Sequence, residues 1–248
     1  MKLYNVFNTT IFFLKVYKLN WYFLLTLYII PATYLTVMFA SSQGSWEALM
    51  AGLTGFTILV SYNTLFYSLA SFTSNMFEEQ IFESYFLMPI PFHEILMAAA
   101  LMQILINIPP TVMSLIMLTY ISANTNFPLL LSGILLTYAF FIPPAILLAI
   151  KVKRRMLLES FLMILMLIMI MATPAFYRLQ YISEPYKTLL LANPLTHLII
   201  MLRASIGLME GFPENISTTY ITTLTSILWI TLWYKLRKGV VTMAEKRI

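Results

Sequence analysis

The amino-acid sequence predicts an all-α integral membrane protein with six transmembrane helices. Of its 248 residues, 60% are hydrophobic and 10% are charged, and the mean hydropathy is +0.83. A soluble domain carries roughly 25% charged residues, so this chain has too few to cover a water-facing surface. A bilayer core of about 30 Å is crossed by roughly 20 apolar residues in a helix. The sequence therefore has room for six or seven spans and forms a single domain over residues 1–248.

The first predicted element is an N-terminal helix over residues 2–18 that lies in the membrane interface. Apolar side chains such as Leu3, Phe7 and Phe13 fall near one helical side, and polar ones such as Asn8 and Lys15 fall near another. This arrangement is typical of a helix that rests on a bilayer instead of crossing it. A disordered tail is the alternative.

Six apolar runs follow, and each is long enough for a span. Their approximate ranges are 21–40, 49–74, 95–121, 127–150, 157–173 and 218–234. Three of them contain prolines, which membrane helices tolerate when neighbouring groups satisfy the freed carbonyls. The side that holds both termini carries 12 of the 15 Lys and Arg residues. Because basic residues accumulate on the inner side, we expect a multi-pass protein of the plasma membrane with both termini in the cytoplasm.

A catalytic site is not expected on this chain. It has no cysteine, which excludes disulfides, thiolate metal sites and cysteine nucleophiles. The two histidines, His93 and His197, fall on opposite sides of the predicted membrane, so we expect no metal site. The sequence contains no P-loop and no hydrolase motif. The net charge of +5 reflects basic residues at span ends and does not indicate binding to nucleic acid.

The second predicted span carries a polar stripe. Hydroxyl side chains recur at steps of three and four residues, which places them on one helical face. The stripe consists of Thr54, Thr57, Ser61, Thr64, Ser68 and Ser71. Small hydroxyl residues favour close helix packing, and they can also line a path for a polar substrate. Both interpretations direct this face inward, and one face could serve both at a subunit interface. On the third span, Gln103 and Asn107 should meet polar partners because a buried amide is costly when unpaired.

Two connections between spans carry further information. The cytoplasmic connection 75–94 is acidic and aromatic, with no Lys or Arg, whereas a loop beside anionic headgroups is normally basic. We interpret it as a docking surface for a protein; solvated glutamates at a helix end are the alternative. Its candidate contact residues are Glu78, Glu79, Phe82, Glu83, Pro89, Pro91 and Glu94.

The second informative connection lies between the fifth and sixth spans. Asn193 and Pro194 can start a helix there, because proline suits the first helical turn. The following apolar face, which includes Leu195, is too short to cross a membrane, so we expect an interfacial or re-entrant helix on the outer side. Arg203 can reach a headgroup or a carboxylate there.

These two connections resemble those of the type-2 ABC transporter permeases. That family has an outer-side N-P-L-T-x-L-x-x-x-x-R stretch, which Asn193, Pro194, Leu195, Thr196, Leu198 and Arg203 match. Its inner segment E-R-E-x-G-T-L-E-x-L-L-x-T-P-V-S-x-x-E-I-L is kept in outline by Glu79, Glu83, Pro89, Glu94, Ile95 and Leu96. The chain lacks the glycine and the basic residue of the inner segment, and it has Pro91 in place of the final serine of T-P-V-S.

The resemblance implies a permease subunit of an ATP-driven exporter. Such a permease pairs with a second copy or a homologue, and a separate P-loop ATPase, which holds ATP and Mg, docks on the cytoplasmic segment between spans two and three as a coupling helix. Substrate is then expected to pass between the two permeases near the second and fifth spans. A non-transport scaffold or immunity subunit is one alternative. A gradient-driven carrier is another, although the predicted spans keep charged residues near their ends.

Overall fold

The computed structural model describes residues 3–19, 33, 36, 39–40, 45–77, 90–122, 124–152, 154–208 and 210–245. Every regular element within these ranges is a helix, which confirms the all-α prediction for them. The first predicted span, 21–40, lies outside the described residues except for Thr33, Thr36, Phe39 and Ala40.

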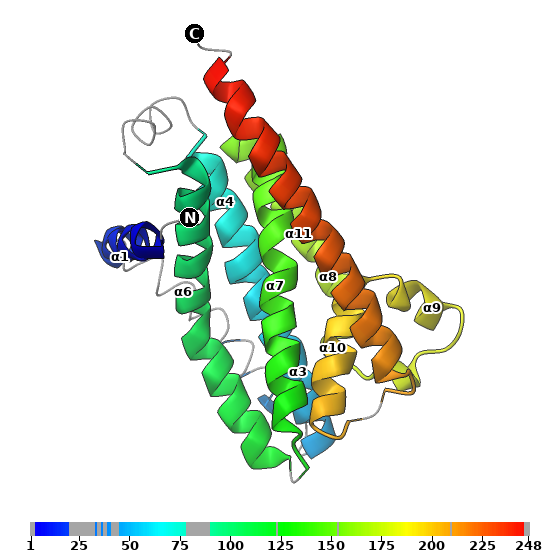
Figure 1. The fold of residues 1–248 in the computed structure, drawn as a ribbon. Coiled ribbons are helices and arrows are strands. Elements are labelled where there is room, and N and C mark those ends of the chain that lie inside the picture. Colours follow the sequence, from blue (N-terminus) through cyan, green and yellow to red (C-terminus); the bar gives the residue numbers. More distant parts are fainter. Residues whose placement is uncertain are drawn as a thin grey trace.

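Three long apolar helices form the centre of the bundle (Figure 1). One continuous helical rod runs over Trp46–Asn75 and consists of α3 (Trp46–Ser61), η1 (Tyr62–Ser68) and α4 (Leu69–Asn75). The other two are α6 (Phe92–Ile121) and α7 (Phe127–Lys151). All three are long and apolar enough to cross a membrane, and they coincide with the second, third and fourth predicted spans. The chain is accordingly a membrane protein.

Two further helices coincide with the fifth and sixth predicted spans. Helix α8 (Arg155–Met171) is apolar but has only 17 residues. Helix α11 (Glu214–Glu245) has 32 residues and extends the predicted range 218–234 at both ends. It begins directly after Pro213 with Glu214 in its first turn, where a carboxylate interacts favourably with the helix dipole. That α8 and α11 cross the membrane stays a prediction.

The middle of the second span is a π-helix, which the sequence analysis did not anticipate. Helix η1 covers Tyr62–Ser68 between two α-helical segments. Around its start, the Ser61 and Thr64 hydroxyls donate to the carbonyls of Thr57 and Val60, both at 2.9 Å. Such back-bonding commonly bends a helix, and π segments frequently occur at functional sites.

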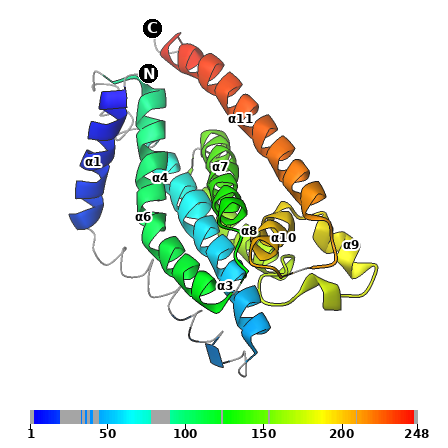
Figure 2. The ribbon, with the colours of Figure 1, turned by 60° about the horizontal axis from the view of Figure 1, so that its bottom comes forward.

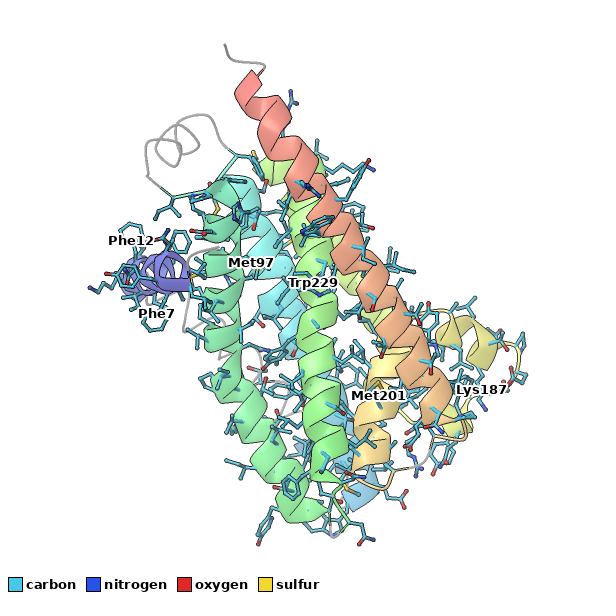
Figure 3. All side chains as sticks on the ribbon, in the orientation of Figure 1. Phe7, Phe12, Met97, Lys187, Met201 and Trp229 are labelled. Carbon is cyan, nitrogen blue, oxygen red and sulfur yellow. The ribbon has the colours of Figure 1, made fainter. Side chains whose placement is uncertain are left out.

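Helix α1 (Leu3–Leu19) lies across the flank of α6, where Figure 1 shows it end-on and Figure 2 shows it along its length. Val6, Thr10 and Phe13 are buried against the bundle, while Leu3 and Phe7 are 76% and 59% exposed. The apolar side predicted from the sequence therefore divides into a packing face and an exposed face. Phe7 and Phe12 point to opposite sides of the helix (Figure 3).

Three contacts hold α1 in place. The Asn5 amide donates to Glu94 Oε2 at 3.0 Å, and the Thr10 hydroxyl lies 3.3 Å from the Ala98 carbonyl. Phe13 meets Phe72 of α4 edge to face, with ring centroids 5.1 Å apart. These contacts fasten α1 to α4 and to the first turns of α6.

Helix α7 lies at the centre of the bundle and contacts α3, η1, α4, α6, α10 and α11. Glycine permits two of the closest approaches in the fold. At Gly55 of α3, an added Cβ would overlap the backbone of Ala175. At Gly133 of α7, it would meet only the flexible end of Leu202, at 2.9 Å. The first contact leaves no room for any side chain, whereas the second can adjust.

Alanine substitution at each glycine distinguishes the contact with a backbone from the contact with a flexible side chain. Gly55→Ala should destabilise the fold by about 3 kcal/mol because a backbone segment must shift, and Gly133→Ala should cost about 1 kcal/mol or less. Thermal unfolding in detergent measures both. Equal losses from the two substitutions would contradict the close approach of α3 to Ala175.

Candidate functional site

The segment between α8 and α11, which we call the cap, contains the residues that the sequence analysis assigned to the outer helix motif. The cap comprises residues 172–208 and 210–213. It contains η2 (Leu179–Tyr181), α9 (Tyr186–Leu191) and α10 (Pro194–Ser205). Helix α10 occupies the predicted position of the re-entrant helix and is buried over most of its length.

The start of α10 is fixed by Asn193. Its side-chain oxygen accepts from the Leu195 amide at 3.0 Å, which caps the helix, and Pro194 occupies the first turn. The side-chain nitrogen of Asn193 also donates to the Ala172 carbonyl and to the Thr173 hydroxyl, both at 2.8 Å. One residue therefore joins the start of α10 to the end of α8.

Two neighbouring side chains continue this pattern. The Thr196 hydroxyl donates to the Leu190 carbonyl at 2.7 Å. His197 Nε2 lies 2.8 Å from the Leu191 carbonyl, and His197 Nδ1 lies 3.0 Å from the Ser217 hydroxyl. Because a carbonyl can only accept, the proton lies on Nε2, and Nδ1 accepts from Ser217. The sequence analysis gave His197 no role, although its place directly after Thr196 in the motif is a usable signal.

Arg203 is fully buried, and its guanidinium joins three segments of the chain. Its nitrogens reach α3 at the Thr54 hydroxyl (3.1 Å) and the Ala51 carbonyl (3.0 Å). They also reach the segment after α8 through the carbonyls of Pro174 (2.8 Å), Ala175 (3.3 Å) and Tyr177 (2.9 Å). Glu210 supplies the carboxylate, at 3.0 Å. Of the two partners that the sequence allowed, a headgroup or a carboxylate, Arg203 therefore meets the carboxylate.

Glu210 belongs to a chain of alternating charges. Its carboxylate is buried and, besides Arg203, accepts from the Leu179 amide and lies 3.6 Å from Arg178 Nε. Arg178 in turn pairs with Glu47 at the start of α3, whose side chain is 64% exposed. The two arginines and two glutamates balance in charge, so the series leads from the interior to the surface without a net charge. The sequence analysis missed Glu210, Arg178 and Glu47 because they are far apart in the chain.

The cap contains irregular backbone whose carbonyls need donors. Within a membrane, backbone that is not helical is tolerated only where protein satisfies it. Asn193, Thr196, His197 and Arg203 of the α10 motif together donate to the carbonyls of residues 172, 174, 175, 177, 190 and 191. The motif therefore closes the break in the helical bundle between α8 and α11.

The polar stripe of the second span lies inside the bundle, and its side chains find partners within the same chain. Thr54, Thr57, Ser61, Thr64 and Ser68 are all buried. Ser61 accepts from the Asn107 amide and Ser68 accepts from the Gln103 amide, each at 3.1 Å. We call these two amide–hydroxyl pairs the polar seam; they join the rod 46–75 to α6 directly before η1 and at its last residue.

The partners predicted for Gln103 and Asn107 are thus present in the seam. Thr54 lies at one end of the stripe, where it accepts from Arg203. At the other end, Ser71 donates to Glu159 Oε1 at 2.7 Å. Glu159 lies one turn inside α8, within the fifth apolar run, so this run carries a charged side chain that meets the second span.

Most of the predicted docking segment, including Glu78, Glu79, Phe82, Glu83 and Pro89, lies outside the described residues. Two further members are described. Pro91 is the N-cap of α6, and Glu94 is buried beneath α1 as the acceptor for Asn5. Glu94 therefore links two helices and does not present its carboxylate to a surface. Among the described residues, there is also no cluster of His, Asp or Glu that could hold a metal ion.

The chain matches no known protein-family model and no curated protein.

The two glutamates that pair with the arginines should contribute very differently to the free energy of unfolding. Glu210→Gln leaves Arg203 charged and buried without its counter-ion, so we expect a loss of about 3 kcal/mol or more in the free energy of unfolding. Glu47→Gln removes an exposed partner and should cost at most about 1 kcal/mol. Denaturant unfolding of the purified protein measures both. A similar cost for the two changes would show that the buried pair does not hold the cap.

Replacing the polar seam tests whether the stripe packs helices or lines a path. Gln103→Met alone removes the amide that Ser68 accepts from and should cost about 1 kcal/mol, whereas Gln103→Met with Ser68→Ala removes both polar partners and should be nearly neutral. The measurements are thermal stability in detergent and, in vesicles, transport, which is the activity that the resemblance implies. Stable double-variant protein with lost activity would instead assign the stripe to a path.

Proposed function

We propose that this chain is a permease subunit of an ATP-driven ABC exporter of the type-2 class. The observation that carries the proposal is the outer motif, Asn193–Arg203. Each of its polar side chains bonds the backbone of the cap, so the residues that match the family pattern act together in this chain. A short buried helix of this kind between the fifth and sixth spans is what the resemblance implies.

The proposed subunit has six spans, of which residues 21–40 form the first, and both termini in the cytoplasm. It pairs with a second copy or a homologue, and a separate P-loop ATPase supplies ATP hydrolysis. The absence of a P-loop from the sequence is consistent with this division of labour. ATP-driven closure of two ATPases would draw the docking segments together and open the membrane halves in turn.

The contacts of α1 supply a route for this movement. Asn5 is bonded to Glu94, and Thr10 lies against Ala98 in the next turn of α6. Glu94 is the last residue of the proposed docking segment and lies in the first turn of the long helix α6. A displacement of the docking segment would therefore reach α1 and α6 together.

The polar stripe has a restricted role in this proposal. Four of its six hydroxyls are engaged within one chain by α6, α8 and α10, and the other two bond carbonyls of their own helix. We therefore assign the stripe to packing. The substrate would then move between two permease copies along faces of the second and fifth spans that do not take part in these contacts.

Purification of the tagged chain from its native membrane tests the proposal. We expect a P-loop ATPase to co-purify and ATP hydrolysis to depend on the permease. Glu79→Lys with Glu83→Lys should reverse the charge of the docking segment and lower the recovery of the ATPase at least about tenfold, the equivalent of roughly 1.4 kcal/mol in binding.

The matched control is Glu184→Lys with Glu214→Lys, two exposed glutamates at the cap end of the molecule. These changes make the same alteration in net charge and should leave ATPase recovery unchanged. Recovery of the permease without any ATPase would favour the scaffold alternative. Equal recovery with both double variants would remove the docking assignment.

A further inference from the structure

A groove of about 650 Å³ opens on the flank of the molecule between the end of α8 and the cap. Its walls come from three elements: the last turn of α8, the segment around η2, and α9. The lining residues are Ile168, Met171, Ala172, Tyr177, Tyr181, Ile182, Ser183, Tyr186, Leu189 and Leu190. The groove therefore has a nearly continuous apolar and aromatic surface, without a charged side chain in its lining.

The side chains of the groove are exposed to an unusual degree for their type. Met171, Tyr181, Tyr186 and Leu189 are 82%, 74%, 67% and 68% exposed. Large apolar surfaces that stay open in a folded chain indicate an interaction site. Here they surround a concave space, which distinguishes them from residues that simply face lipid on a convex helix.

The position of the groove along the length of the bundle indicates what fills it. Helices α6 and α8 begin at the same end of the bundle (Figure 1), but α6 has 30 residues and α8 has 17. At 1.5 Å per residue, α8 ends roughly 20 Å short of the far end of α6. Figures 1 and 2 both place α9 on the outer flank beside α10 and the start of α11. The groove therefore opens sideways at a level between the two ends of α6, a helix long enough to cross a membrane.

The groove is also continuous with an apolar surface of α8. Ile164, Leu167, Ile168 and Met171 are 59%, 63%, 54% and 82% exposed, and the last two form part of the groove wall. An acyl chain that lies along this helix can enter the groove without crossing any polar surface. The tyrosines add apolar ring surface to the groove wall, and each also carries a hydroxyl that can form a hydrogen bond.

Arg178, the residue directly before η2 on one wall of the groove, is already paired. The Arg178 guanidinium lies 5.7 Å from the Tyr181 ring centroid and forms ion pairs with Glu47 and Glu210. A lipid phosphate would have to displace a carboxylate to reach it. Arg178 is accordingly not available to recognise a headgroup charge.

We propose that the groove binds one acyl chain of a membrane phospholipid, inserted between the end of α8 and α9. The bound chain fills the space that the short helix α8 leaves beside the cap. Tyr177 connects the groove to the charge network, because its side chain lines the groove and its carbonyl accepts from Arg203. The groove lies at the end of α8, the fifth predicted span, and its test requires neither an ATPase nor transport.

A phosphatidylcholine with a photoreactive acyl chain tests the proposal in vesicles of unlabelled phosphatidylcholine. After illumination, mass spectrometry maps the adducts on the full chain. We expect adducts in the peptides around 168–172 and 177–190 that saturate as the mole fraction of probe rises. Adducts near Ile116, an exposed residue of α6, should rise linearly as for ordinary surrounding lipid. Figure 2 shows α6 and α9 on different flanks of the bundle.

Ala172→Phe should fill the groove and lower the groove adducts about tenfold, with the α6 adducts unchanged as an internal control. Ser183→Trp narrows the groove from its exposed rim and should give the same result if Ala172→Phe does not fold. Replacing phosphatidylcholine by phosphatidylglycerol should not alter the groove yield. Groove adducts that never saturate, that survive both substitutions, or that depend on the headgroup would overturn the proposal.

Discussion

The cap depends on one buried guanidinium. Arg203 can be accommodated in the interior only because every direction in which it donates meets an oxygen of the chain, and Glu210 balances its charge. The Arg203 guanidinium in turn donates to the carbonyls of residues 174, 175 and 177, which lie outside the helices. The break between α8 and α11 and the burial of Arg203 therefore require each other. The position of α3 follows as well, because Ala51 and Thr54 are among the acceptors and Gly55 lets the cap backbone approach.

Neutral polar pairs join the helices in the middle of the bundle. The amides of Gln103 and Asn107 meet hydroxyls of the rod 46–75, and Tyr138 of α7 donates to Thr111 of α6 at 3.0 Å. Between apolar helices in a membrane, packing and hydrogen bonds replace the hydrophobic driving force. Such pairs fix which face of each helix meets its neighbour, while the surrounding leucine, isoleucine and alanine side chains fill the space.

Much of this arrangement could be predicted from local patterns. The spacing of hydroxyls in the second span identified its inward face, the amides of α6 implied polar partners, and Asn193–Pro194 marked the start of α10. Pairing across the chain could not be predicted. Glu210, Arg178 and Glu47 form one charge series only after folding, and a glutamate one turn inside an apolar run, Glu159, was overlooked. The π-helix has no periodic signature that the sequence displays. The function stays a proposal because the motif defines a segment and not a reaction.

The π-helical segment η1 of the second span holds one residue more than α-helical winding would over the same rise. The two pairs of the polar seam lie at Ser61, directly before η1, and at Ser68, its last residue. Return of this segment to α-helical winding would turn everything beyond it by about 100° around the helix axis. Only one of the two pairs could then keep its register with α6. The two pairs of the seam therefore oppose a change of winding in η1, because such a change would break at least one of them.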